Sequence, residues 1–179
     1  DVIEVYLEHL THVDTIKGER GTDTIAIVGN SIDHNMWDNG TPSEQSFDSI
    51  STVETLAFGT TTTSYTISGT ASINLSSKVQ AAGILNIDAS NASGVGDDVL
   101  VVNASTFSSR AKLTFIGSDD KDINVHFIGG SGDDTLTTGK ITEDASDTLA
   151  GGFGVDTFNI VATETTAMIA DLGIGGADI

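Results

Sequence analysis

The sequence contains no cysteine and few aromatic residues. Without cysteine the fold has neither disulfide bonds nor thiolate metal sites, so a chain that works outside the cell needs another means of stabilisation. Of the 179 residues 38% are hydrophobic and 6% are aromatic, which leaves a modest core built mostly from Val, Ile, Leu and Ala. A thin core of this kind favours an elongated stack of repeats over a single compact domain.

Positive charge is also scarce. Only 7 Lys and Arg residues stand against 26 Asp and Glu residues, which gives a formal net charge of -19. An anionic surface of this density repels nucleic acid and acidic membranes. We therefore expect no nucleic-acid partner, and we expect cations to be the natural partners of the surface.

Long apolar runs are missing as well. No window approaches the ~20 apolar residues of a membrane span, and no basic-then-apolar signal opens the chain. The sequence predicts no membrane insertion. Because the chain begins at Asp1 without Met, we expect a fragment or a processed product of a longer protein.

Two nine-residue segments carry the strongest signal that is present. Residues 129–137 read GGSGDDTLT and residues 151–159 read GGFGVDTFN, and both fit the pattern G-G-x-G-x-D-x-U-x without a mismatch. This pattern is typical of a calcium-binding half-turn of a parallel β-roll. The glycines permit a tight turn, the aspartate offers a hard oxygen ligand, and the apolar U residue (Leu136 or Phe158) points into the core.

Degraded copies of the same pattern occur elsewhere. Residues 142–150, with Asp147, run directly into the second perfect copy, and residues 93–101 lack only the first glycine. A third block near the N-terminus spaces Asp14 and Asp23 nine residues apart, with Glu19 in the second glycine position. Two perfect and three degraded copies make a repeat protein the leading interpretation.

Between the copies, short runs rich in β-branched residues alternate with Asn, Asp, Ser and Gly, and each run is about one strand long. Crossover helices do not fit the intervals, so the strands follow one another as turns of a coil or as a meander, and the repeats favour the coil. The predicted strands cover residues 52–58, 64–68, 71–75, 83–88, 99–103, 111–116 and 123–128.

Residues 31–50 differ from the rest. They hold the only Trp and the only Pro, and Thr41-Pro42-Ser43-Glu44 forms a capping box that predicts a short helix. We interpret this stretch as an insertion or cap. The predicted organisation is a degenerate repeat segment over 1–30, the cap over 31–50, β-solenoid strands over 51–128 and a β-roll over 129–179.

The repeats predict where calcium would bind. Two half-turns complete a coil of about 18 residues, and an ion between stacked turns takes carboxylate oxygens and backbone carbonyls. Asp134 and Asp156 are 22 residues apart and would share an edge, whereas Asp147 would lie on the opposite edge. The alternative is that Gly-Asp turns simply link strands. The candidate metal-binding residues are Asp14, Gly21, Asp23, Gly96, Asp98, Gly130, Gly132, Asp134, Asp147, Gly152, Gly154 and Asp156.

Other groups of residues give weaker evidence for a zinc site or a catalytic site. His9 and His12 would face opposite sides of a strand, and the remaining histidines, His34 and His126, are distant in sequence, so no zinc set is evident. No arrangement of Ser, His and Asp can be singled out as catalytic. The sequence therefore predicts a protein that is not an enzyme.

The nonapeptides resemble those of RTX (repeats-in-toxin) proteins, which bacteria export by type I secretion. The segments 85–90 and 101–105, LNIDAS and VVNAS, are similar to strand phrases of RTX-type S-layer proteins and large adhesins. The resemblance implies an all-β parallel β-roll or β-solenoid, bound Ca²⁺ and an extracellular or cell-surface location.

The resemblance leaves three functions open. The first is a structural subunit that self-associates into a surface lattice or filament. The second is the repeat region of a secreted adhesin, and the third is the accessory module of a secreted enzyme. A cell-surface polysaccharide is a further possible partner.

Overall fold

The computed structural model describes residues 1–6, 9, 14–32, 35–37, 49–139, 146–161 and 168–170. Within these residues strands dominate and one α-helix is present. The predicted helix after Thr41 lies outside the described residues. In the described part of the chain, no helix has the length and apolar character that crossing a membrane requires.

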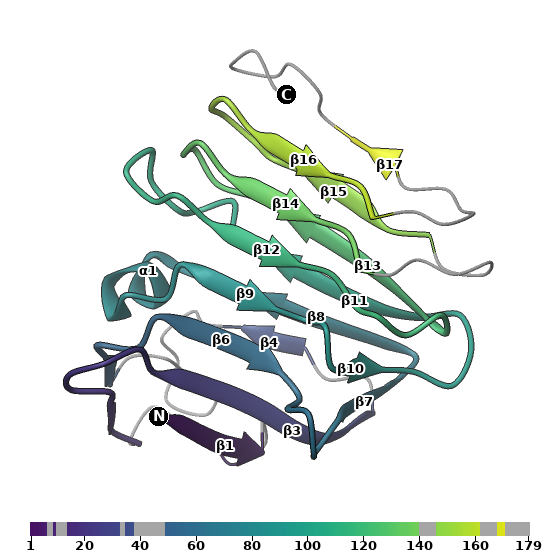
Figure 1. Cartoon of the computed structure of the whole chain (residues 1–179), viewed down its shortest axis with the longest axis horizontal. Coiled ribbons are helices and arrows are strands. Elements are labelled where there is room, and N and C mark those ends of the chain that lie inside the picture. Colours follow the sequence, from purple (N-terminus) through teal and green to yellow (C-terminus); the bar gives the residue numbers. More distant parts are fainter. Residues whose placement is uncertain are drawn as a thin grey trace.

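Parallel pairing organises the strands into two large sheets (Figure 1). The nine-stranded sheet contains β1 (Val2–Tyr6), β3 (Thr24–Ile32), β6 (Thr55–Phe58), β7 (Tyr65–Ser68), β9 (Asn86–Asp88), β10 (Ala92–Ser93), β12 (Thr114–Ile116), β14 (Thr135–Thr137) and β16 (Thr157–Asn159). The six-stranded sheet contains β4 (Asn35–Trp37), β8 (Thr70–Asn74), β11 (Asp98–Asn103), β13 (Ile123–Ile128), β15 (Thr148–Ala150) and β17 (Met168–Ile169). A short pair joins β2 (Ile16–Lys17) to β5 (Ile50–Ser51).

From β11 onward the chain alternates between the two sheets, strand by strand. In Figure 1 the strands β9, β12, β14 and β16 lie in front, and β8, β11, β13 and β15 lie behind them. Thr135 in β14 pairs with Thr157 in β16, and His126 in β13 pairs with Thr148 in β15. From β13 to β17 each strand therefore pairs with strands that are two positions away in the chain order, whereas β11 also pairs with β8 and β12 with β9.

The hydrophobic core lies between the two sheets. The strands follow the alternation expected for one buried face, as in β13, where Ile123, Val125 and Phe127 are buried. Phe115 from β12 stacks on Phe127 from the opposite sheet, with ring centroids 4.2 Å apart. This stacking and the surrounding aliphatic side chains hold the sheets together without disulfides.

The structure confirms the all-β, parallel expectation, and each strand run predicted from the sequence contains an observed strand. The helix α1 (Ser77–Ala82) was not predicted. It begins at the N-cap Ser76, whose hydroxyl accepts a hydrogen bond from the Lys78 nitrogen, and it ends at Gly83 with φ 102°. A serine before the turn and a glycine after it were the available signals.

The spacing between paired strands varies along the chain. Asp134 and Asp156 share one edge at an interval of 22 residues, as expected, which exceeds the coil of about 18 residues that two nonapeptides form. Thr114 pairs with Thr135 at a shorter interval, and Thr24 pairs with Thr55 at a longer one. The strands are only part of each interval, and the connecting turns carry the additional residues.

Truncation of Phe127 tests the core. We expect Phe127→Ala to lower the free energy of unfolding by about 3–5 kcal/mol, because the variant loses a fully buried ring and leaves a cavity. Urea denaturation followed by circular dichroism measures this loss. Ile128→Ala is the matched control, since the neighbouring side chain is 38% exposed, and its effect should be at most about 1 kcal/mol. Equal losses in the two variants would contradict the assigned core.

Candidate metal centre

Carboxylates, all of them buried except the half-buried Glu54, occur where strands begin, and they follow one geometric rule. Each carboxylate accepts a hydrogen bond from the backbone nitrogen of the residue that occupies the equivalent position on the preceding strand of its sheet. We call this set the carboxylate ladder. Its members are Asp23, Glu54, Asp98, Asp134, Asp147 and Asp156.

The two perfect nonapeptides form the C-terminal part of the ladder. The Asp156 Oδ1 accepts from the Asp134 nitrogen at 2.8 Å, and the Asp134 Oδ1 accepts from the Leu113 nitrogen at 2.9 Å. The Asp134 Oδ2 accepts from the Gly130 nitrogen of its own turn at 3.1 Å. Asp134 and Asp156 are 1% and 0% exposed, so these bonds satisfy amides that water does not reach.

The six-stranded sheet repeats the rule. The Asp147 Oδ1 accepts from the Val125 nitrogen at 2.9 Å, and the Asp98 Oδ1 accepts from the Gly69 nitrogen at 2.7 Å. The Asp98 Oδ2 accepts from the Val95 nitrogen of its own turn at 2.8 Å. Asp147 therefore lies in the opposite sheet from Asp134, as the sequence predicted.

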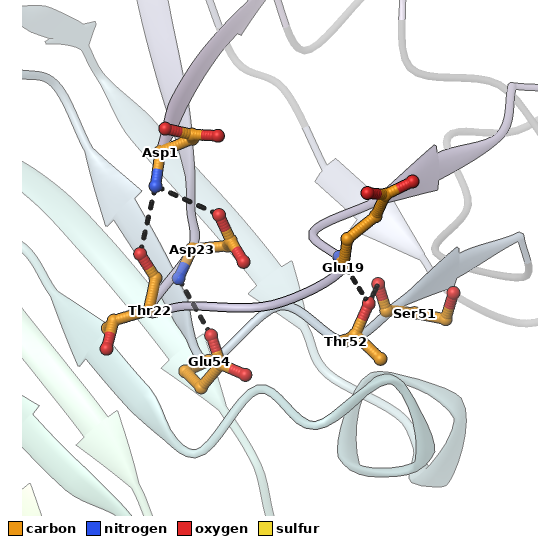
Figure 2. Close-up of polar contacts among 7 residues, drawn as sticks. All are labelled: Asp1, Glu19, Thr22, Asp23, Ser51, Thr52 and Glu54. Carbon is orange, nitrogen blue, oxygen red and sulfur yellow. Dashed lines mark hydrogen bonds and ion pairs between the residues drawn. The ribbon is translucent and has the colours of Figure 1, made fainter.

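The N-terminal part of the ladder is drawn in Figure 2. The Asp23 Oδ1 accepts from the Asp1 nitrogen at 2.9 Å, and the Asp23 nitrogen donates to the Glu54 Oε2 at 2.8 Å. The Glu19 nitrogen donates to the Thr52 hydroxyl, which fixes the adjacent turn. Asp23 is 3% exposed, and its Oδ2 has no hydrogen-bond partner in the described part of the chain.

The two perfect nonapeptides do not share one turn conformation. Gly152 and Gly154 have φ of 95° and 142°, which favours glycine, whereas Gly130 and Gly132 have no such positive φ. In the first copy the requirement is close approach instead: a Cβ at Gly132 would lie 1.6 Å from the Ala111 carbonyl oxygen. One pattern thus uses glycine for two physical reasons.

Backbone carbonyls of the first copy lie close to the glycines of the second copy, which stacks on it. A Cβ at Gly152 would lie 2.1 Å from the Gly130 oxygen, and one at Gly154 would lie 2.2 Å from the Gly132 oxygen. The N-terminal turn repeats this backbone, because Glu19 and Gly21 occupy the same positions with φ of 64° and 134°. The carbonyl oxygens of Gly130 and Gly132 therefore lie against the next turn, where the Gly130 oxygen accepts a hydrogen bond from the Phe153 nitrogen at 3.0 Å.

Burial changes the acidity of these aspartates. Removal from water raises the pKa of Asp134 to about 6, against the opposing effect of its two backbone hydrogen bonds. Burial also raises the pKa of Asp147. By contrast, the bond from the Val155 nitrogen, assisted by Lys112, lowers the pKa of the exposed Asp133. Asp134 and Asp147 thus carry a desolvation cost that a cation would offset.

The donor set suits a hard cation. Carboxylate and carbonyl oxygens are the ligands that Ca²⁺ prefers, and a carboxylate oxygen that accepts one hydrogen bond retains a second lone pair. Within the described ranges, no three His, Cys, Asp or Glu side chains gather at one point. A metal here would therefore rely on two carboxylates, from Asp134 and Asp156, and on the glycine carbonyls.

The structure separates the remaining sequence candidates. Asp14 precedes β2, in the small two-stranded pair, and does not join the ladder. Gly96 borders open space, with nothing within 4 Å of an added Cβ. Glu54 was missed, although Glu54-Thr55-Leu56 has the same acid–x–apolar spacing as Asp23-Thr24-Ile25. That spacing was the available signal.

Comparison of the chain with protein-family models, with curated proteins and with solved structures finds no match. The interpretation of the site therefore depends on its own geometry.

Two glycine variants test the stacked turns. We expect Gly132→Ala to destabilise the protein by about 2 kcal/mol or more, because the methyl group would collide with the Ala111 carbonyl. Gly96→Ala is the control, and it should leave stability unchanged within about 0.5 kcal/mol. Thermal and urea unfolding measure both. Similar stability of the two variants would show that the turns are not packed as described.

The pKa of Asp134 predicts a pH effect in the calcium-free protein. A carboxyl whose folded pKa is raised from 3.8 to about 6 favours the fold when protonated, and this stabilisation is lost as pH rises through 6. Asp134→Asn keeps an oxygen for the Leu113 nitrogen but cannot ionise. We expect the stability of the variant relative to the native chain to increase between pH 4 and pH 7, measured by urea unfolding with a chelator present. A difference that is constant with pH would contradict the raised pKa.

Proposed function

We propose that this chain is a calcium-stabilised β-solenoid segment of a bacterial cell-surface or extracellular assembly, such as an S-layer or filament subunit. The observation that carries the proposal is the stacking of the two perfect nonapeptides. Asp134 and Asp156 occupy the same position on neighbouring strands, and the carbonyl oxygens of Gly130 and Gly132 lie against Gly152 and Gly154 of the next turn.

In this proposal, the metal supplies positive charge between stacked turns, and the chain supplies oxygen. Asp134 and Asp156 would each contribute a carboxylate oxygen, while Gly130 and Gly132 would contribute carbonyls. The turns at Gly152 and Gly154 can approach these carbonyls closely because they lack side chains. The degraded copies around Asp98 and Asp147 keep the ladder bond and have fewer glycines, so they would stack with little or no metal.

Two observations support a solenoid. Parallel strands alternate between facing sheets from β11 to β17, and their apolar side chains fill the space between the sheets. Successive turns of one winding chain would produce this order. The resemblance of the nonapeptides to RTX repeats points to the same architecture.

Electrostatics couple folding to the ion. The chain carries a net charge of -19, and its ladder buries several carboxylates at a desolvation cost. A divalent cation would reverse this repulsion locally, so calcium outside the cell would complete a fold that is weaker without it. Export in a less folded state followed by folding in external calcium agrees with this coupling.

The proposed role is structural, with self-association as its outcome and no catalysis. The repeat region of a secreted adhesin is the second candidate, favoured by the polar trough described below. An accessory module of a secreted enzyme would use the same calcium chemistry, with its catalytic domain elsewhere in the protein.

Calcium titration tests the proposal. We expect millimolar CaCl₂ to raise the melting temperature of the native chain and to induce ordered assemblies in electron micrographs. MgCl₂ at equal ionic strength should do neither, since Mg²⁺ accepts this open carbonyl-rich geometry poorly. The absence of any calcium effect on stability would contradict the proposed metal site. A protein that calcium stabilises but that remains a monomer would contradict the proposed assembly.

A matched pair of variants locates the ion. Asp156→Asn keeps the oxygen that accepts from the Asp134 nitrogen but loses the charge, so calcium should stabilise this variant much less than the native chain. Asp133→Asn changes the neighbouring exposed aspartate, 53% accessible and paired with Lys112, and should retain the calcium response. Equal calcium responses in both variants would place the ion elsewhere.

A further inference from the structure

A polar trough lies beyond the carboxyl ends of β6, β9 and β12. The turns that follow these three strands, 59–64, 89–93 and 117–121, gather at one edge of the nine-stranded sheet, to which the arrows of all three strands point in Figure 1. Together they line a cavity of about 480 Å³ that is open to solvent. The lining includes Thr60, Thr61, Ser90, Asn91, Asp119 and Lys121.

The floor of the trough is held by hydrogen bonds between turns. The buried Ser118 hydroxyl donates to the Ala92 carbonyl at 2.8 Å and accepts from the Asp120 nitrogen at 3.0 Å. The Asp120 carboxylate accepts from the nitrogens of Gly94 and Asp122. Two of the three turns are therefore tied together, and their polar groups are fixed before any ligand arrives.

The third turn is packed against the second. Gly59 has φ 87°, and a Cβ there would lie 2.6 Å from the Asn91 carbonyl oxygen. The Thr60 hydroxyl accepts from the Thr63 nitrogen at 3.0 Å, which closes the turn on itself. This close approach sets the width of the trough between Thr60 and Asn91.

We propose that this trough binds a neutral saccharide. Sugar hydroxyls both donate and accept hydrogen bonds, and the lining offers both kinds of partner: carboxylates at Asp119 and Asp120, an amide at Asn91, an ammonium at Lys121 and several hydroxyls. The Lys121 ammonium also pairs with Asp122, and the Asn91 amide also donates to the Ser90 hydroxyl, so both groups are held in place by bonds within the turns. The volume falls within the range of about 300–1,000 Å³ that is usual for small-ligand sites.

The same groups disfavour other ligands. Two carboxylates against one lysine, on a chain of net charge -19, oppose acidic sugars and phosphate. Among the residues that the structure describes, no aromatic ring lines the trough, so binding would depend on hydrogen bonds without a stacking surface. Because the cavity is open to water, we expect a dissociation constant on the order of 1 mM.

The trough is separate from the proposed calcium centre. Its turns lie between residues 59 and 121, a range that contains neither perfect nonapeptide. The inference thus goes beyond the calcium proposal, and either one can fail without the other. A binding site for a neutral glycan would allow a structural segment to bind a polysaccharide surface.

Titration with neutral disaccharides tests the inference. The probes are maltose, cellobiose, lactose and N,N′-diacetylchitobiose, each added to the full chain in calcium-containing buffer, with amide shifts followed by NMR. We expect at least one probe to shift amides of the three turns. Galacturonate, sodium phosphate and additional CaCl₂ serve as comparison ligands and should leave these amides unmoved.

A pair of double variants assigns any response to the trough. Thr61→Ala with Asn91→Ala removes lining groups without touching the Ser118 bonds, and should weaken binding at least tenfold. Ser105→Ala with Ser109→Ala, in the exposed turn after β11, is the control and should bind as the native chain does. Circular dichroism confirms that both variants are folded.

Three results would overturn the inference. They are no shift with any disaccharide, binding that the Thr61 and Asn91 substitutions leave unchanged, and a response at the trough to phosphate, galacturonate or calcium alone. The last result would assign the trough to an ion.

Discussion

The hydrogen bond from a backbone nitrogen to a carboxylate on the next strand is the interaction on which the rest of the structure depends. At the ends of parallel strands, some backbone amides make no hydrogen bond to a neighbouring strand, and leaving such an amide buried without a partner costs free energy. Asp134 and Asp156 satisfy them in one sheet, as Asp98 and Asp147 do in the other. The bond also fixes register, because it joins residues at equivalent positions. The facing apolar side chains, including Phe115 and Phe127, can then interlock.

Much of the fold could be predicted from the sequence. Alternating β-branched runs gave the strands and their buried faces, since both depend on local periodicity. The shared edge of Asp134 and Asp156 was predicted from the motif. The intervals between other paired strands, such as Thr24 with Thr55, could not be predicted, because turn length depends on contacts between distant segments. Glu54 was missed because its longer side chain departs from the aspartate of the motif, although it bonds to the Asp23 nitrogen in the same way.

The candidate site shows where motif reasoning succeeds and where it stops. The pattern correctly placed Asp134 and Asp156 in one sheet and Asp147 in the other, since position in a repeat fixes position in a stack. It gave no indication of why each copy needs glycine. In the first copy a side chain at Gly132 would collide with the Ala111 carbonyl, whereas Gly152 and Gly154 adopt positive φ angles that favour glycine. For Asp23 and Asp98 it left two roles open, metal ligand or member of a plain Gly-Asp turn; in the structure Asp98 accepts from the Gly69 amide and Asp23 from the Asp1 nitrogen.

The ladder has a direction. Every carboxylate reaches back to a strand that precedes it in the chain, so each new strand is fixed by a template that has already formed. Loss of β16 would take Asp156 away with it and leave one backbone amide uncovered. Loss of β1 would instead deprive the buried Asp23 carboxylate of the Asp1 nitrogen. The ladder is therefore asymmetric: removing a strand that supplies a carboxylate leaves an amide uncovered, whereas removing the strand that supplies the nitrogen leaves a buried carboxylate without that donor.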